Sequence, residues 1–149
     1  MCFKKVFVVT ESISEKLNTF CMPIAQFCAR LYVANVFFQA GLLKVGDFGN
    51  TLFLFEYEYQ VPLLPFELAA YMATAGELVL PILLVFGLFG RFASLGLLVM
   101  TLVIELLVYP GTVEHYYWML LLGLLFSGGV GKLSVDYFLW PRIKKYLGA

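Results

Sequence analysis

Four long apolar stretches constrain the fold of this 149-residue chain more than any other feature of its sequence. An α-helix needs roughly 17–25 residues to cross the ~30 Å hydrocarbon core of a bilayer. The first two stretches reach that length, the third is at its lower limit and the fourth is shorter. They cover residues 23–45, 65–89, 92–109 and 116–130. This pattern predicts helices that span a membrane.

The composition also favours membrane integration. Hydrophobic residues make up 62% of the chain and charged residues 13%, whereas soluble domains have roughly 45–50% apolar and about 25% charged residues. The stretch from Leu78 to Leu88 is apolar almost throughout, unlike the alternating strands of membrane β-barrels. The predicted fold is therefore all-α, an integral membrane bundle of four transmembrane helices. The formal net charge is zero, which argues against a nucleic-acid partner.

The basic residues predict which ends of the helices face the cytoplasm. They gather in the N-terminal segment, in the connection between the second and third stretches, and in the C-terminal tail. They are Lys4, Lys5, Lys16, Arg91, Lys132, Arg142, Lys144 and Lys145. Because short loops rich in Lys and Arg stay in the cytoplasm, both termini are expected there. The connections around residues 50–64 and 110–114 are expected on the outer side.

Three regions follow from this pattern. Residues 1–22 are expected to form a cytoplasmic N-terminal segment, a short helix against the membrane surface without a cleavable signal peptide. Residues 23–131 form the four-helix transmembrane domain. Residues 132–149 form a cytoplasmic tail, in which apolar residues beside basic ones predict an interfacial amphipathic helix over residues 134–146. Pro141 is expected to kink this helix.

The sequence offers little for thiol, haem or metal chemistry. Cys2, Cys21 and Cys28 all fall at or near the predicted cytoplasmic side, where thiols stay reduced. The single histidine cannot form a bis-histidine haem site, and a zinc site needs several Cys or His ligands. No flavin or iron–sulfur motif occurs either. We therefore expect no metal site and no cofactor within the chain itself.

Four ionisable residues, one for each apolar stretch, are the candidate functional residues: Arg30, Glu77, Glu105 and His115. A charge inside a membrane costs free energy and is rarely placed there without a partner or a function. At 1.5 Å per residue, Arg30 lies about 10 Å from the inner end of its helix, and Glu77 lies near the midplane. We therefore expect an Arg30–Glu77 ion pair that holds two helices in register. The alternative is a ligand-binding role for Arg30, Lys44 and Glu77.

Glu105 and His115 are expected at the same depth in the outer half of the membrane. A short turn through Tyr109, Pro110 and Gly111 separates them, which brings a carboxylate and an imidazole close together. Because histidine titrates near neutral pH, such a pair can pass protons. We predict Glu105 and His115 as the catalytic pair. The structural alternative is a histidine at a helix end that contacts interfacial water.

Several short motifs resemble, in order and spacing, those of the DoxX family. They are Ala29-Arg30-Leu31, Ala40-Gly41-Leu42-Leu43-Lys44-Val45-Gly46-Asp47, Gly76-Glu77-Leu78, Phe86-Gly87-Leu88-Phe89-Gly90-Arg91, Val108-Tyr109-Pro110, His115-Tyr116-Tyr117-Trp118 and Gly129-Val130-Gly131-Lys132-Leu133-Ser134-Val135-Asp136. Family patterns often have Gly-Pro-Gly-Arg at the exit of the fourth helix, where this chain has Val130 and Lys132. The resemblance covers about residues 24–138.

This resemblance implies a small multi-pass protein of the bacterial inner membrane, of a family linked to quinone-dependent sulfur oxidation or to oxidative-stress complexes. Two functions remain open. One is a membrane subunit that binds a quinone, with Arg30, Lys44 and His115 as hydrogen-bond donors and Glu77 and Glu105 as proton acceptors. Its electrons would come from a redox partner protein. The other is a non-catalytic scaffold, or a protein that handles small solutes or metals. A homodimer is compatible with the glycines on the helix faces.

Overall fold

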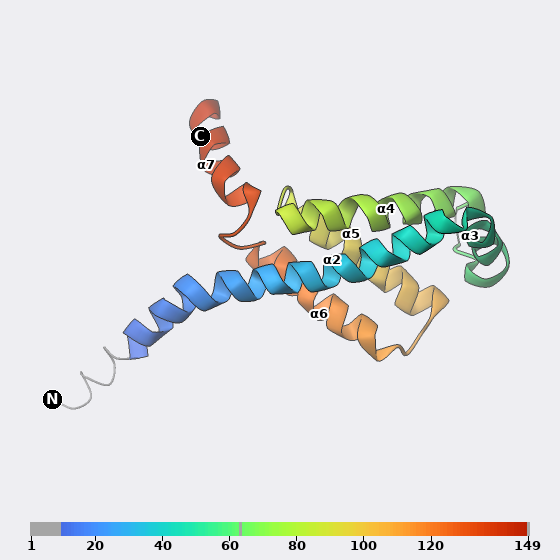
Figure 1. Ribbon diagram of the computed structural model, residues 1–149, viewed down its shortest axis with the longest axis horizontal. Helices are drawn as coiled ribbons and strands as arrows, with labels where there is room; N and C mark the ends of the chain where they lie inside the picture. Colours follow the sequence, from blue (N-terminus) through green and yellow to red (C-terminus); the bar gives the residue numbers. More distant parts are fainter. Residues whose placement is uncertain (1–9, 63, 149) are drawn as a thin grey trace.

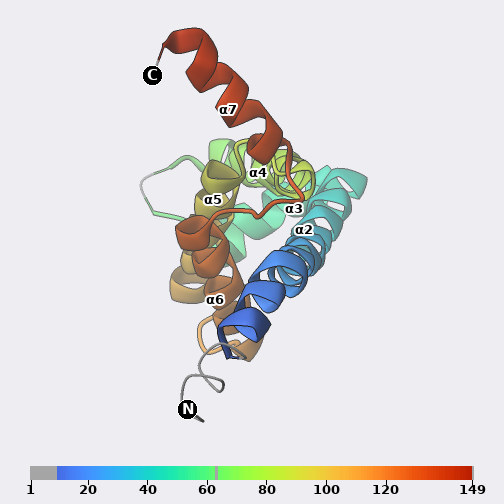
Figure 2. The same ribbon diagram turned by 90° about the vertical axis from the view of Figure 1, so that its left-hand side faces the viewer.

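The computed structural model describes residues 10–62 and 64–148. Within these ranges the chain is helical and contains no strand, which confirms the all-α prediction. The bundle consists of α2 (Met22–Gly46), α4 (Phe66–Phe86), α5 (Gly90–Val103) and α6 (Val113–Gly128). These four helices lie alongside one another, whereas α7 (Val135–Leu147) projects from one end of the bundle (Figures 1 and 2). The short helix α3 (Phe48–Leu54) and the π-helical turn η2 (Phe55–Tyr59) close the opposite end.

Three helices in the described ranges are long and apolar enough to cross a membrane: Thr10–Gly46, Phe66–Phe86 and Gly90–Val108. The third of these is α5 continued by a π-helical segment, η3 (Ile104–Val108). In contrast, α6 has 16 residues, or about 24 Å at 1.5 Å per residue. It is therefore short of the usual spanning length, and the fourth span stays a prediction.

Large apolar side chains cover the outside of the bundle. Leu43, Leu106 and Leu120 are 77%, 70% and 62% exposed. In each of the three long helices, at most 33% of an apolar stretch of 18 residues is buried inside the protein. Because so much exposed apolar surface is unfavourable in water, these helix faces suit the hydrocarbon of a bilayer.

The first membrane-spanning helix starts earlier than the sequence predicts. From Thr10 the chain continues without a break into α2, through the π-helical turn η1 (Leu17–Cys21). No glycine or proline interrupts residues 10–22, so the helix has no intrinsic stop there. The wider turn ends two residues before Pro23, whose ring and missing N–H disfavour regular α-helical bonding in the turn before it. The expected separate helix is thus continuous with α2 from Thr10 onwards. Residues 1–9 lie outside the described residues, and the cytoplasmic position of residues 1–22 stays a prediction.

The predicted helix in the C-terminal tail is confirmed as α7. Its start is capped by the hydroxyl of Ser134, which accepts the backbone N–H of Tyr137 at 3.3 Å. Pro141 lies inside the helix, which continues beyond it to Leu147. The axis of α7 runs across the direction of α2 and α4 (Figure 1). Such an orientation suits a helix that lies in the surface of a membrane when the bundle spans it.

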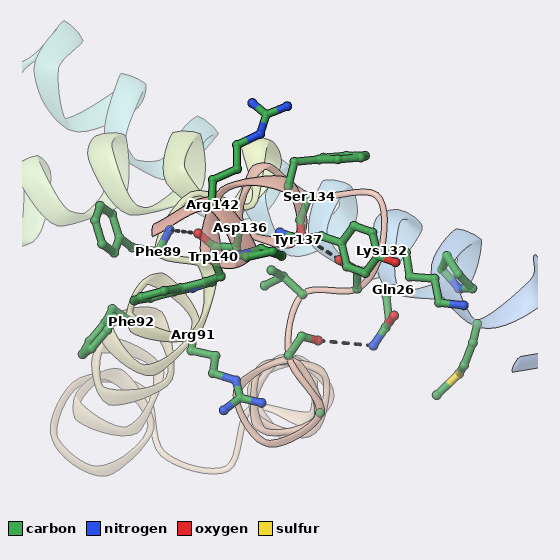
Figure 3. A pocket seen from close by; sticks show the side chains of 18 of the residues that line it. Gln26, Phe89, Arg91, Phe92, Lys132, Ser134, Asp136, Tyr137, Trp140 and Arg142 are labelled. Atoms are coloured by element: carbon green, nitrogen blue, oxygen red, sulfur yellow. Dashed lines mark hydrogen bonds between the residues drawn. The ribbon is translucent and has the colours of Figure 1, made fainter. Parts of the chain in front are cut away.

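The connection between α6 and α7 ties the helix ends together. One carboxylate oxygen of Asp136 accepts the backbone N–H of Phe89 at 2.9 Å (Figure 3). The other accepts the backbone N–H of Gly90 at 2.8 Å. These amides lie at the start of α5, where N–H groups lack intrahelical acceptors. Gly90 also permits the close approach of Val130, because a Cβ at Gly90 would lie 2.3 Å from Cγ1 of that valine.

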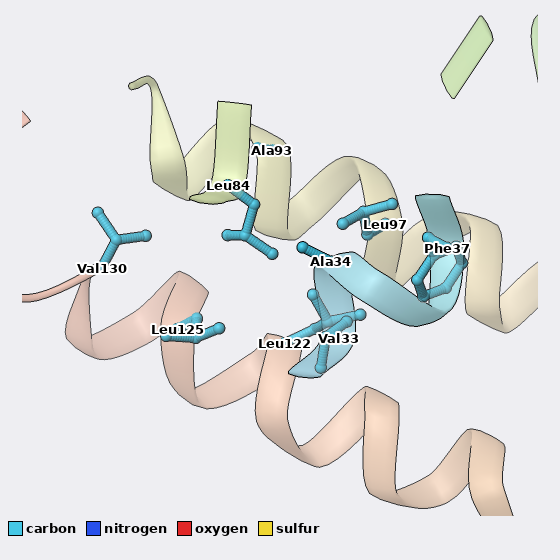
Figure 4. Close-up of a cluster of buried hydrophobic side chains, with 9 residues drawn as sticks. All are labelled: Val33, Ala34, Phe37, Leu84, Ala93, Leu97, Leu122, Leu125 and Val130. Atoms are coloured by element: carbon cyan, nitrogen blue, oxygen red, sulfur yellow. The ribbon is translucent and has the colours of Figure 1, made fainter. Parts of the chain in front are cut away.

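All four bundle helices contribute to the main apolar core (Figure 4). Its buried members are Val33, Ala34, Phe37, Leu84, Ala93, Leu97, Leu122, Leu125 and Val130. Small residues set the closest helix contacts, as is common in membranes. Gly41 shows this between α2 and α4, since a Cβ there would lie 2.9 Å from Cδ2 of Leu78. The core therefore fixes the relative heights of the helices, and with them the heights of the buried charges.

Candidate functional site

The centre of the candidate site is the carboxylate of Glu105, in η3 at the end of the third span. Its Oε2 lies 2.7 Å from Nδ1 of His115. Its Oε1 accepts the backbone N–H of Gly111 at 2.7 Å and the hydroxyl of Tyr116 at 2.9 Å. Glu105 and His115 are only 7% and 5% exposed. Three donor groups thus converge on one buried carboxylate. A carboxylate that is removed from water needs such hydrogen bonds, because its burial otherwise costs free energy.

The local chain geometry explains why these groups meet. Gly111 has a φ of +83°, a conformation that glycine adopts without steric cost, and its N–H points back to Glu105. His115 lies in the first turn of α6, ten residues after Glu105. The expected contact between the carboxylate and the imidazole is confirmed. The catalytic role of the pair stays a prediction.

The contact with Glu105 defines the hydrogen bonding of His115. A nitrogen that faces a carboxylate donates its proton, so Nδ1 is assigned as the donor, and Nε2 of the neutral ring carries a lone pair. Within the described residues, Nδ1 makes the only hydrogen bond of this ring. The assignment leaves Nε2 as the nitrogen that can accept a proton or a ligand donor.

An aromatic group lies directly beside His115. The ring centroids of His115 and Trp118 are 5.1 Å apart, and Phe37 meets Trp118 edge to face at 5.7 Å. The indole Nε1 of Trp118 is buried and has no acceptor among residues 10–62 and 64–148. A buried donor without a partner costs free energy, so this N–H suits an acceptor on a bound molecule.

A second buried pair joins α2 and α4, and it corrects the expected Arg30–Glu77 pair. Nζ of Lys44 contacts the two carboxylate oxygens of Glu77 at 2.8 and 2.7 Å. The side chain of Glu77 is 4% exposed and that of Lys44 is 20% exposed. The two helices run in opposite directions (Figure 1), and Lys44 lies fourteen residues beyond Arg30, about 21 Å along α2. Glu77 lies at the level of the lysine, out of reach of the arginine.

Arg30 binds backbone carbonyls instead of a carboxylate. Its guanidinium donates to the carbonyl oxygens of Val85 at 2.9 Å, Val130 at 2.7 Å and Leu133 at 2.8 Å. Val85 belongs to the last turn of α4, where carbonyls lack intrahelical donors and a cation complements the helix dipole. The other two carbonyls belong to the connection between α6 and α7. With an exposure of 1%, Arg30 therefore fastens three segments at one end of the bundle.

Sequence reasoning missed several of these contacts. It left out Tyr116 and Gly111 as donors to Glu105, although both lie next to residues that it considered. It also left out Asp136, which follows the start of α7 and caps α5 from a distance of 46 residues in sequence. The contacts of Gly111 and Tyr116 with Glu105 are local, and the turn residues between Glu105 and His115 could have indicated them. The contact of Asp136 is long-range, and nothing in the local sequence indicated it. Contact of Arg30, Lys44 or Glu77 with a ligand stays a prediction.

Two hollows lie at opposite ends of the bundle. The smaller, of about 230 Å³, borders Lys44, Asp47, Thr51 and Tyr59. The larger, of about 1120 Å³, lies between the first part of α2, the start of α5, the connection after α6 and α7. The larger hollow is remote from the Glu105–His115 pair, so the two are separate candidate sites.

A bundle of long apolar helices with a buried ion pair and an apolar outer surface defines the class of this molecule: it is a multi-pass membrane protein. The chain belongs to the DoxX family, because the family model for DoxX matches residues 25–110, over half of its length. No curated protein and no solved structure shows significant similarity to it. The matched region contains Arg30, Lys44, Glu77 and Glu105 and ends before His115.

Proposed function

We propose that this protein is a membrane subunit of a quinone-linked redox system in the bacterial inner membrane, of the kind that serves sulfur oxidation or the response to oxidative stress. The observation that carries the proposal is the buried hydrogen bond of 2.7 Å between Glu105 and His115. A quinone that accepts two electrons also takes up two protons. A buried carboxylate–imidazole pair is suited to deliver them.

The groups around His115 fit a quinone. A quinone ring is flat and apolar with an oxygen at each end, so it needs aromatic neighbours and a hydrogen-bond donor. Trp118 and Phe37 provide the aromatic neighbours, and the unpartnered indole N–H of Trp118 provides the donor. Nε2 of His115 provides a second polar contact on the same side of α6.

Within this function Glu105 and His115 have distinct roles. Glu105 holds the proton on Nδ1 and orients the imidazole, so that Nε2 takes up and releases the transferred proton. The carboxylate stabilises the imidazolium that exists between these two events. The turn at Pro110 and Gly111 is exposed and adjoins Glu105, so protons can reach the pair from the membrane surface. The two electrons come from a redox partner protein.

Replacement of Glu105 by glutamine tests this role. We expect quinone to remain bound to the purified variant, while the rate of quinone reduction by membranes that contain it falls about 100-fold or more, the usual effect of losing a general acid–base group. His115→Ala should have a similar effect. Bound quinone is measured by solvent extraction, and the rate is followed with a short-chain ubiquinone.

Glu67→Gln is the matched control, because Glu67 is an exposed acid in the first turn of α4. It should keep the rate of the unmodified protein. The proposal fails if the purified protein carries no quinone and both site variants reduce quinone at the normal rate.

A non-catalytic scaffold is the second candidate, and a specific observation favours it. Arg30 donates to three backbone carbonyls and Lys44 pairs with Glu77, so both cations bind groups of the protein itself, as residues that orient helices do. On this view Glu105→Gln lowers the melting temperature and leaves quinone reduction unchanged. The rate of quinone reduction by Glu105→Gln therefore separates the two candidates.

We also infer that α6 is a fourth span and that both termini are cytoplasmic. The first turn of α6 lies beside the end of the third span, because His115 contacts Glu105. The connection after α6 reaches Arg30, which also binds Val85 near the far end of α4. A helix that joins these two levels covers nearly the thickness of the bundle. Tilt and local thinning of the bilayer accommodate its shorter length.

Cysteine labelling in intact cells tests this topology. In a variant whose native Cys2, Cys21 and Cys28 are changed to serine, Glu56→Cys should react with a membrane-impermeant thiol reagent. Lys145→Cys should react only after the membrane is permeabilised. Both positions are exposed in the structure. Labelling at both positions in intact cells would indicate three spans with an outer C-terminus, and the reverse pattern would invert the orientation.

A further inference from the structure

We propose that the larger hollow, at the α7 end of the bundle, binds the phosphate group of one anionic phospholipid. We call it the α7 groove. It has a volume of about 1120 Å³ and is bounded by α2, the start of α5, the connection between α6 and α7, and α7 itself (Figure 3). The inference is independent of the redox proposal, because it concerns the opposite end of the protein.

The charge of the α7 groove favours an anion. Four basic side chains line it: Arg91, Lys132, Arg142 and Lys144. Within the described residues, none of them forms an ion pair. The only acid among the lining residues is Asp136, and backbone N–H groups already occupy both of its carboxylate oxygens. The groove therefore carries an excess of positive charge that the protein does not neutralise itself.

The α7 groove also has an apolar, aromatic side. Phe89, Phe92 and Trp140 are 51%, 69% and 47% exposed. Figure 3 shows Phe92 and Trp140 on the same side of the groove as Arg91. Aromatic rings beside cations are typical of the level at which lipid headgroups meet acyl chains. A phospholipid matches both features, whereas free phosphate matches the cations alone.

The position of the α7 groove in the fold places it at the membrane surface. α4 ends at Phe86 and α5 begins at Gly90, so two spans reach their ends at the rim of the groove. α7 runs across these helices and forms one wall (Figures 1 and 3). The phosphate groups of a bilayer lie just outside the hydrocarbon core, which is the height of the four basic side chains.

Lipid titration of the full-length protein tests the inference. The protein is delipidated in a mild detergent and titrated with phosphatidylglycerol or phosphatidylcholine, and bound lipid is counted by native mass spectrometry. We expect one phosphatidylglycerol per chain, bound at a concentration at least about tenfold lower than phosphatidylcholine. Each basic side chain near a membrane surface contributes about fivefold to the affinity for anionic lipid. The double variant Arg91→Gln, Lys144→Gln should therefore bind phosphatidylglycerol about 25-fold more weakly.

Two adjacent lysines of α7 provide the matched control. Lys144 lines the α7 groove and Lys145 does not, although both are exposed. Lys144→Gln should weaken binding about fivefold, and Lys145→Gln less than twofold. Equal effects would show that the tail attracts lipid only through its overall charge, and the groove would be rejected. Equal melting temperatures of the variants would show that the fold is intact.

Inorganic phosphate distinguishes the two sources of the same chemical group. At a concentration of about 10 mM, far above that of a specifically bound lipid, it should leave phosphatidylglycerol in place, because it lacks the acyl chains that contact the aromatic side. Displacement by phosphate would indicate a site for the free ion and would overturn the assignment to a lipid. Equal binding of the two phospholipids would also overturn it.

Discussion

Replacement of Arg30 by leucine is expected to lower the melting temperature of this protein by about 6–12 °C. The guanidinium donates hydrogen bonds to three backbone carbonyls, those of Val85, Val130 and Leu133. Leucine would leave all three without that donor, at a cost of about 1 kcal/mol or more each. For a protein of this length, 1 kcal/mol corresponds to about 2–4 °C. The ends of α4 and α6 would lose this link to α2, although the bond of 3.2 Å from Gln26 Nε2 to the carbonyl of Gly129 would remain.

The melting curve, followed by circular dichroism in a mild detergent, measures this effect. The melting temperature of Arg30→Lys should lie between those of the unmodified protein and Arg30→Leu. One ammonium group cannot reach three carbonyls in the way that a planar guanidinium does. Arg142→Leu is the control for removal of an exposed arginine and should change the melting temperature by less than about 2 °C. A melting temperature of Arg30→Leu equal to that of the control would contradict the fastening role of Arg30.

Replacement of Lys44 by methionine is expected to destabilise the protein by about 3 kcal/mol, at the low end for a broken buried ion pair. Methionine has a similar length but no charge, so Glu77 would keep a buried carboxylate without its cation. Lys44 is 20% exposed and Glu77 is 4% exposed. Glu77→Leu should therefore cost less than Lys44→Met, because an unpaired lysine can extend towards water while an unpaired Glu77 cannot.

The double variant Lys44→Met, Glu77→Leu distinguishes a buried pair from two independent contributions. We expect it to regain most of the stability that Lys44→Met loses, because an apolar pair of similar size replaces the two charges. Chemical denaturation in detergent of all four proteins completes the cycle. Losses that simply add would mean that Lys44 and Glu77 act separately, against the contacts of 2.7 and 2.8 Å.

The helices were largely predictable, and the exceptions have local causes. The apolar stretches predicted α2, α4 and α5 with ends within a few residues of those observed, because burial in lipid requires continuous apolar sequence. The polar start of the first helix was missed, since residues such as Glu11, Ser12 and Glu15 resemble a separate surface segment. Polar composition, however, does not stop a helix that has no glycine or proline.

The candidate site was predictable where the contact is local. Glu105 and His115 are ten residues apart and joined by one tight turn, so the geometry of the turn alone brings them together. The predicted partner of Glu77 was wrong because the pairing depends on the relative position of two helices along their axes. A shift of a few residues changes the height by several ångströms, enough to exchange Arg30 for Lys44.

By itself, the sequence determined that this chain is helical, that its helices suit a membrane, that it resembles the DoxX family, and that Glu105 lies beside His115. These follow from composition and from neighbours in sequence. Only the tertiary structure decided that Lys44 neutralises Glu77, that Arg30 binds three carbonyls, and that four basic side chains line the α7 groove. Contacts of this kind depend on the packing of small residues such as Gly41 and Gly90 against distant helices, which sets the heights of the helices and has no signal in the local sequence.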